Sequence, residues 1–228
     1  MAEQKNQNGH LNVEDALTGS EAFLVKYKNV IIGCVIAVIV IVAGVILYKN
    51  FYVAPRETKA QVALFKGQEL FEQDQYEQAL NGDSIGDFKG FLKVADEFSG
   101  TKSANLAKAY AGICYAHLNQ YDKALKYLDE FNAKDQMVAP SILAAAGNCY
   151  AQLGQMDKAT SNLLAAADKA DNSSLSPIFL MQAGEIFVKQ GKFDDAIKAY
   201  TTIKDKYFQS YQATEIDKYI EQAKLMKK

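Results

Sequence analysis

Few side chains in this sequence could take part in metal or covalent chemistry. Its 228 residues include two histidines, His10 and His117, and three cysteines, Cys34, Cys114 and Cys149. His10 lies in a polar tail and His117 stands alone, so neither has a companion at a metal-ligand spacing. The sequence also lacks a glycine-rich phosphate loop, a nucleophile paired with a base and an HExxH pair. We therefore expect a protein that is not an enzyme and that binds neither a metal nor a cofactor.

The cysteines do not form a disulfide framework, because their number is odd and small. Cys34 lies within an apolar run, whereas Cys114 and Cys149 fall at equivalent positions of two neighbouring predicted helices. The axes of packed helices lie ~8–10 Å apart, which is too far for a disulfide between equivalent positions. We expect Cys114 and Cys149 to be free thiols in helix cores.

The longest apolar run covers residues 30–47, which contain no charge and no proline. A helix over this run is about 27 Å long, close to the ~30 Å thickness of the hydrocarbon core of a bilayer. Tyr27 and Tyr48 lie at its ends, where aromatic rings favour the headgroup level. The sequence therefore predicts one transmembrane helix, residues 29–49, between a tail of residues 1–28 and a domain of residues 50–228. Lysines flank both ends of the span, so charge favours a tail inside the cell without deciding the orientation.

Two other interpretations of this run concern Cys34 and Ala54. The sequence Ile31-Ile32-Gly33-Cys34 resembles a lipoprotein box, but such a box closes an apolar region and most of this run follows Cys34. Ala54 is followed by Pro55, which disfavours cleavage there as a signal peptide. An uncleaved anchor is favoured over both. Small residues at three positions of one face could let a partner helix approach closely, although such residues are common in membrane helices. These positions are Gly33, Ala37 and Gly44.

An internal repeat runs through the domain. In each copy a glycine is followed by an aromatic residue three positions later and by an alanine twelve positions later. The glycines are 35 and 37 residues apart, the length of a helix pair, and a weaker copy begins at Gly67. The three copies are Gly112, Tyr115 and Ala124; Gly147, Tyr150 and Ala159; and Gly184, Phe187 and Ala196.

This pattern resembles that of the tetratricopeptide repeat family, in which small residues let two antiparallel helices pack closely. The expected fold is all-α, a single N-terminal transmembrane helix followed by a tetratricopeptide repeat α-solenoid. The expected repeats are residues 60–98, 105–138, 140–173 and 177–210, closed by a capping helix at residues 211–226. The sequence Asn81-Gly82-Asp83 is expected to break the second helix of the first repeat, as a tolerated insertion or as a functional loop.

The family resemblance also implies where a partner binds, because the first helices of the repeats line a concave groove. The groove positions here lack the paired lysines with which some relatives hold a peptide carboxylate, so we expect a general protein or peptide segment as the ligand. The net charge of −2 provides no basic surface for nucleic acid. Some of these side chains are expected to contact the next repeat instead. The groove candidates are His117, Asn148, Gln152, Met181, Glu185 and Lys189.

The order of parts, with the stretch Ala79 to Asp83, resembles a narrower group, the YfgM-like ancillary subunits of the bacterial SecYEG translocon, most closely their Bacteroidetes branch. That resemblance implies a cytoplasmic tail, a single pass through the bacterial inner membrane and a periplasmic domain. It also implies association with the translocon and with a membrane-anchored periplasmic chaperone of the prolyl-isomerase type. The alternative is a structural assembly factor for another envelope complex.

Overall fold

The computed structural model describes residues 13–82 and 88–227, with side chains from residue 25 onward. All regular structure in these ranges is helical, which confirms the all-α prediction. The chain divides into two units, Met1–Pro55 and Arg56–Lys228. Residues 83–87, which belong to the insertion that is expected to be either tolerated or a functional loop, lie outside the described residues.

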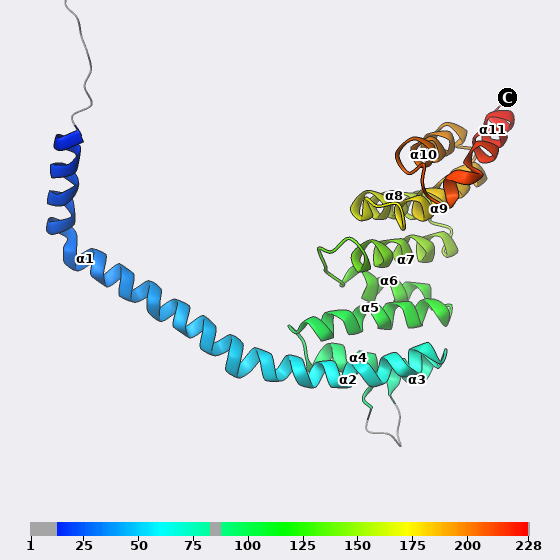
Figure 1. The fold of residues 1–228 in the computed structure, drawn as a ribbon. Coiled ribbons are helices and arrows are strands. Elements are labelled where there is room, and N and C mark those ends of the chain that lie inside the picture. The colour runs from blue at the N-terminus through cyan, green and yellow to red at the C-terminus, as the bar shows by residue number, and fades with distance from the viewer. Residues whose placement is uncertain (1–12, 83–87, 228) are drawn as a thin grey trace, which may run out of the picture. The chain divides into compact units, whose positions relative to one another are not determined.

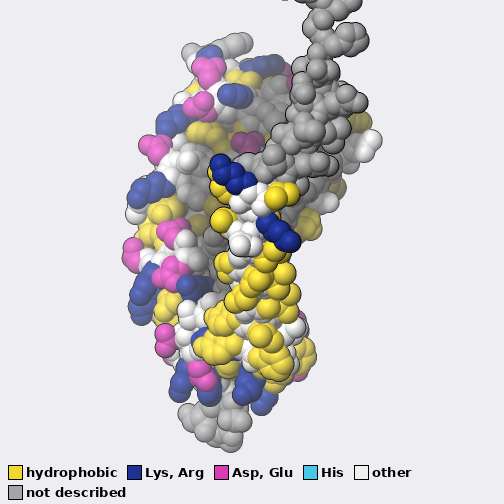
Figure 2. Space-filling view, turned by 90° about the vertical axis from the view of Figure 1, so that its left-hand side faces the viewer, with side chains coloured by type: hydrophobic (Ala, Val, Ile, Leu, Met, Phe, Trp, Pro, Cys, Tyr) yellow, Lys and Arg dark blue, Asp and Glu magenta, His cyan; other side chains and the backbone are white. Residues whose placement is uncertain are grey.

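The first unit contains one long apolar helix. Helix α1 (Val13–Tyr48) leads into a π-helical turn, η1 (Lys49–Val53), and α2 (Ala54–Glu72) follows without a break. The apolar part has a mean hydropathy of 3.4 and none of it is buried, so this helix is long and apolar enough to cross a membrane. Figure 2 shows hydrophobic side chains along the side of this helix that is in view, with basic side chains beyond them. A side chain added at Gly33 or Gly44 would meet open space, and their role as a docking face stays a prediction.

The second unit is a stack of helix pairs (Figure 1). The two helices of each pair pack against each other, and successive pairs pack on one another. A last helix covers the final pair. After α2 the helices are α3 (Tyr76–Asn81), α4 (Gly90–Glu97), α5 (Lys102–His117), α6 (Tyr121–Asp129), α7 (Val138–Gln152), α8 (Met156–Ala170), α9 (Ser176–Lys189), α10 (Phe193–Lys206), the 3₁₀ turn η2 (Gln212–Thr214) and α11 (Ile216–Lys227).

The turn inside each pair has the same backbone geometry in all four copies. At Asp74, Asn119, Gly154 and Gly191 the backbone adopts a positive φ, of 58°, 57°, 74° and 71°. The next amide donates back over the turn, for example from Gln120 to the Tyr115 carbonyl at 2.8 Å. This hydrogen bond satisfies a carbonyl at the helix end and reverses the chain. The chain therefore reverses in the same way between the two helices of every repeat.

The repeat glycines lie where the two helices of a pair approach most closely. An added Cβ at Gly112 would lie 2.6 Å from Leu128, and one at Gly147 would lie 3.1 Å from Leu163. The alanines twelve residues after the glycines, Ala124, Ala159 and Ala196, have no exposed surface. Tyr115 and Tyr150 are half-buried, and Phe187 is buried beside its glycine. Small residues thus allow close packing, and larger ones fill the space around them.

The first repeat departs from this pattern, because its second helix is divided into α3 and α4. Helix α3 ends at Asn81, and Gly82 follows it with a φ of 92°, as the predicted helix break requires. Gly90 begins α4 with a φ of 77°, and an added Cβ there would lie 2.4 Å from the Asn81 backbone. The two short helices therefore meet at a crossing that only glycine fits.

Candidate functional site

A recess between the first helices of two repeats contains three of the predicted groove residues. It has a volume of about 290 Å³ and lies between the C-terminal halves of α5 and α7. His117 contributes from α5, and Asn148 and Gln152 contribute from α7, all three with exposed side chains. The other lining residues are Ile113, Ala116, Tyr121, Ala145 and Cys149.

The recess has an apolar floor and a neutral polar rim. Ile113, Ala116 and Ala145 supply apolar surface that is only partly buried. The amides of Asn148 and Gln152 each offer both donors and an acceptor, which matches the hydrogen-bonding groups of a peptide backbone. No aspartate, glutamate, lysine or arginine among the described residues lines this recess. The site can therefore pair with backbone amides and with an apolar side chain without selecting charge.

His117 is held by aromatic rings that the sequence pattern did not associate with it. Its imidazole stacks on the ring of Tyr76, with centroids 4.2 Å apart and an interplanar angle of 8°. Phe71 meets the same imidazole edge-on at 6.3 Å. The Tyr76 hydroxyl in turn donates to the Asp74 carboxylate in the turn before α3. The irregular first repeat thus positions the histidine at one end of the recess.

A second recess, of about 220 Å³, lies between α9 and the closing helix. It brings together Glu185 and Lys189 of α9 with Tyr219 and Gln222 of α11. Tyr200 forms its floor, and burial, with a smaller effect of nearby Glu185, raises the pKa of this phenol to about 12. Unlike the first recess, this one presents an acidic side chain, Glu185, and a basic side chain, Lys189.

The six groove candidates therefore fall into three environments. His117, Asn148 and Gln152 share the first recess, and Glu185 and Lys189 share the second. Met181 is half-buried, packs against the core of the last repeats and lines neither recess.

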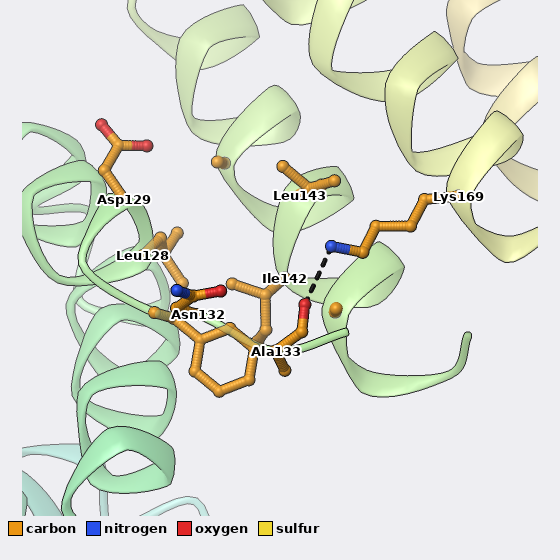
Figure 3. Close-up of a pocket in the computed structure, with 10 residues that line it drawn as sticks. Leu128, Asp129, Asn132, Ala133, Ile142, Leu143 and Lys169 are labelled. Carbon is orange, nitrogen blue, oxygen red and sulfur yellow. Dashed lines mark hydrogen bonds between the residues drawn. The ribbon is translucent and has the colours of Figure 1, made fainter. Parts of the chain in front are cut away.

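The connection between α6 and α7 forms a further recess that the sequence pattern did not indicate. It encloses about 140 Å³ against an apolar wall that includes Leu128 and Ile142. As Figure 3 shows, Lys169 reaches across its mouth, and its ammonium donates to the Ala133 carbonyl at 2.9 Å. Asn132 lies in the same connection, and its backbone N–H donates to the side-chain oxygen of Asn105 at 3.2 Å. These polar groups hold the connection in place, so this recess is a product of loop packing.

The two domain cysteines are free and buried. Burial raises the pKa of the Cys114 thiol to about 12 and that of the Cys149 thiol to about 11. Both thiols are therefore protonated at neutral pH, and a thiol must lose its proton to act as a nucleophile or as a metal ligand. Among the described residues there is also no group of three His, Cys, Asp or Glu side chains that could hold a metal ion.

Comparison with known proteins identifies a family that covers most of the chain. A sequence model for a family described as a tetratricopeptide repeat-like domain matches residues 21–225. A comparison with curated proteins finds no match.

Proposed function

Because the chain belongs to the tetratricopeptide repeat-like domain family, a class of protein-interaction module, we propose that it is a membrane-anchored scaffold that binds protein segments. The observation that carries this proposal is the recess between α5 and α7. There the exposed polar side chains of two neighbouring repeats converge over an apolar floor.

The proposed ligand is an extended segment that crosses the first helices of the repeats. Asn148 and Gln152 would bond its backbone, and one apolar side chain would enter the recess over Ile113. Further along the stack, Glu185 and Lys189 would pair with polar groups of the same segment. Since backbone bonding is independent of sequence, such a groove suits varied, unfolded clients.

The apolar helix of the first unit would act as the anchor. Its role is to hold the repeat domain at the membrane, which raises the effective concentration of the groove for anything else held there. The face of Gly33, Ala37 and Gly44 would dock against another membrane helix, because small residues permit close helix contact.

We place this scaffold at the protein-translocation channel of the bacterial inner membrane. The N-terminal tail would be cytoplasmic and the repeat domain periplasmic. Emerging chains and a membrane-anchored chaperone of the prolyl-isomerase type would be its partners. The support for this assignment is the order of parts, in which a short tail and one apolar helix precede a small repeat domain.

The test is affinity capture of the full-length protein in a mild detergent. It compares the native chain, a chain whose residues 29–49 are replaced by an unrelated spanning helix, and the groove variant Gln152→Lys, Glu185→Lys, Lys189→Glu. We expect channel subunits to be lost with the exchanged anchor and chaperone or client proteins to be lost with the groove variant. The translocon assignment is wrong if no secretion component accompanies the native chain. Stoichiometric, salt-stable capture of one other complex would instead indicate an assembly factor.

A further inference from the structure

The first helix of the repeat stack exposes a surface that the other repeats bury. This surface, the leading face of α2, is centred on Val62, Phe65 and Glu69, which share one side of the helix by their spacing, and the exposed Lys59 and Lys66 lie along one edge of it. Val62 is 63% exposed and Phe65 is 59% exposed, so two large apolar side chains lie side by side on this surface. Lys59 and Glu69 are exposed on either side of them along the helix.

The repeat pattern identifies what this face corresponds to in the rest of the domain. Val62 lies five residues before Gly67, and the residues five before the other repeat glycines are Ala107, Ile142 and Phe179. These three are 0%, 6% and 6% exposed. Each belongs to a core cluster that includes residues of the preceding repeat. The leading face of α2 is therefore the surface that joins one repeat to the one before it, left without that earlier repeat.

We propose that the leading face of α2 binds the same face of a second copy of this chain, with the two α2 helices antiparallel. If Val62 of one copy lies opposite Phe65 of the other, Glu69 lies opposite position 58. Lys59, the residue after position 58, is then displaced by only ~1.5 Å along the helix axis from the point opposite Glu69. Each Lys59 therefore faces a Glu69 of the other copy, twice in the symmetric pair, while the apolar side chains meet in the middle.

The charges select this arrangement over two others. A parallel pair would place Lys59 beside Lys59 and Glu69 beside Glu69, which repel. An anionic lipid surface fits less well, because Glu69 lies on the same side of the helix as Val62 and Phe65. Mixed charge around a small apolar centre is self-complementary, as a two-fold interface between identical chains requires.

The size of the face sets the expected strength of the pair. Only two large apolar side chains per copy contribute, so the contact lies at the low end of specific interfaces. We therefore expect a dimer that forms and dissociates with protein concentration. The proposal is independent of which partner occupies the groove, since it uses none of the residues that line either recess.

The first experiment is cross-linking of the full-length protein in lipid nanodiscs that hold two copies. The background carries Cys34→Ala, which leaves the two buried thiols. In it, the double variant Lys59→Cys, Glu69→Cys should form an intermolecular disulfide on mild oxidation, because the two positions of one chain are ~15 Å apart along the helix and cannot join each other. Lys198→Cys, at an exposed position of α10, is the matched control and should stay monomeric. Equal cross-linking of the control, or none in the double variant, would overturn the proposal.

The second experiment separates this interface from self-association of the membrane helix. Phe65→Ser should weaken the dimer about tenfold, as removal of a central aromatic residue usually does. Lys59→Glu and Glu69→Lys should each weaken it, and the two changes together should restore it because the charges are exchanged symmetrically. If the dimer affinity were unchanged in all four variants, the contact would lie elsewhere and the proposal would be rejected. Protection of position 65 by lipid in a monomeric chain would also reject it, in favour of membrane contact.

Discussion

Replacing Gly184 by alanine should destabilise the repeat domain far more than the same change at Gly147. The two glycines occupy the same position of successive repeats, and both face the residue sixteen positions later on the second helix. At Gly184 an added Cβ would lie 2.2 Å from the Tyr200 ring, and at Gly147 it would lie 3.1 Å from Leu163 and from a backbone oxygen. Tyr200 is 1% exposed and its ring is rigid, so the contact could be relieved only by displacing the whole ring.

The expected magnitudes follow from two opposing effects. Alanine is about 1 kcal/mol better than glycine inside a helix, which favours both substitutions. Overpacking a filled core costs roughly 1–3 kcal/mol or more, and a contact of 2.2 Å places Gly184 at the upper end of that range. We expect a net loss of about 2 kcal/mol for Gly184→Ala and a change smaller than about 1 kcal/mol for Gly147→Ala.

Urea unfolding of the full-length protein in detergent, followed by circular dichroism, measures both changes. Adding Tyr200→Leu to Gly184→Ala provides the control, because leucine is the residue at this position in the other two repeats. The double variant should lose less stability than the sum of the two single variants. Equal effects of alanine at Gly184 and Gly147, or strict additivity with Tyr200→Leu, would refute the packing argument.

Three further predictions concern other contacts of the domain. Glu57 accepts two backbone amides at the start of α5 and the Ser103 hydroxyl. Burial raises the pKa of the Glu57 carboxyl, but these hydrogen bonds outweigh that effect, so the net pKa is lowered. Glu57→Gln should therefore destabilise the domain at pH 7, as measured by urea titration. The difference in stability from the native chain should vanish as the pH falls below about 4.5, because the native carboxyl then becomes protonated. Ser176→Ala should cost roughly 0.5–1.5 kcal/mol in the same assay, since the buried Ala167 carbonyl loses its 2.7 Å hydrogen bond and keeps the one from the Asp171 backbone amide, whereas alanine at an exposed serine should change little. In a Cys34→Ala background, the two domain thiols should react with a thiol reagent at pH 8 only after unfolding, and rapid reaction of the native chain would contradict their burial.

The helix pairs were predictable from the sequence because their signals are local. The close approach of two adjacent helices is indicated by a glycine, an aromatic residue and an alanine at fixed spacing. The turn between these helices is indicated by residues that favour a positive φ, such as Asn119 and Gly154. The end of α3 at Asn81 was predictable for the same reason, since Gly82 follows directly.

The arrangement of the candidate groove was less predictable, because it depends on contacts between repeats. His117 stacks on Tyr76, forty-one residues earlier and in the one repeat whose spacing is irregular. Repeat register placed Met181 beside the other groove candidates, yet its flexible side chain is half-buried against the neighbouring core. The exposed face around Phe65 was equally hard to predict, because it matters only since the described residues before α2 form no repeat that covers it.

The central claim is that the recess between α5 and α7 contacts a protein partner, and site-specific photocross-linking tests it most directly. A benzoylphenylalanine in place of Asn148 lies at the recess, and one in place of Lys198 lies at an exposed position of the second helix α10. In native membranes the full-length protein should form protein adducts from position 148 and not from position 198. Those adducts should weaken with Gln152→Ala. Adducts of equal strength from both positions, or none from position 148, would contradict the account.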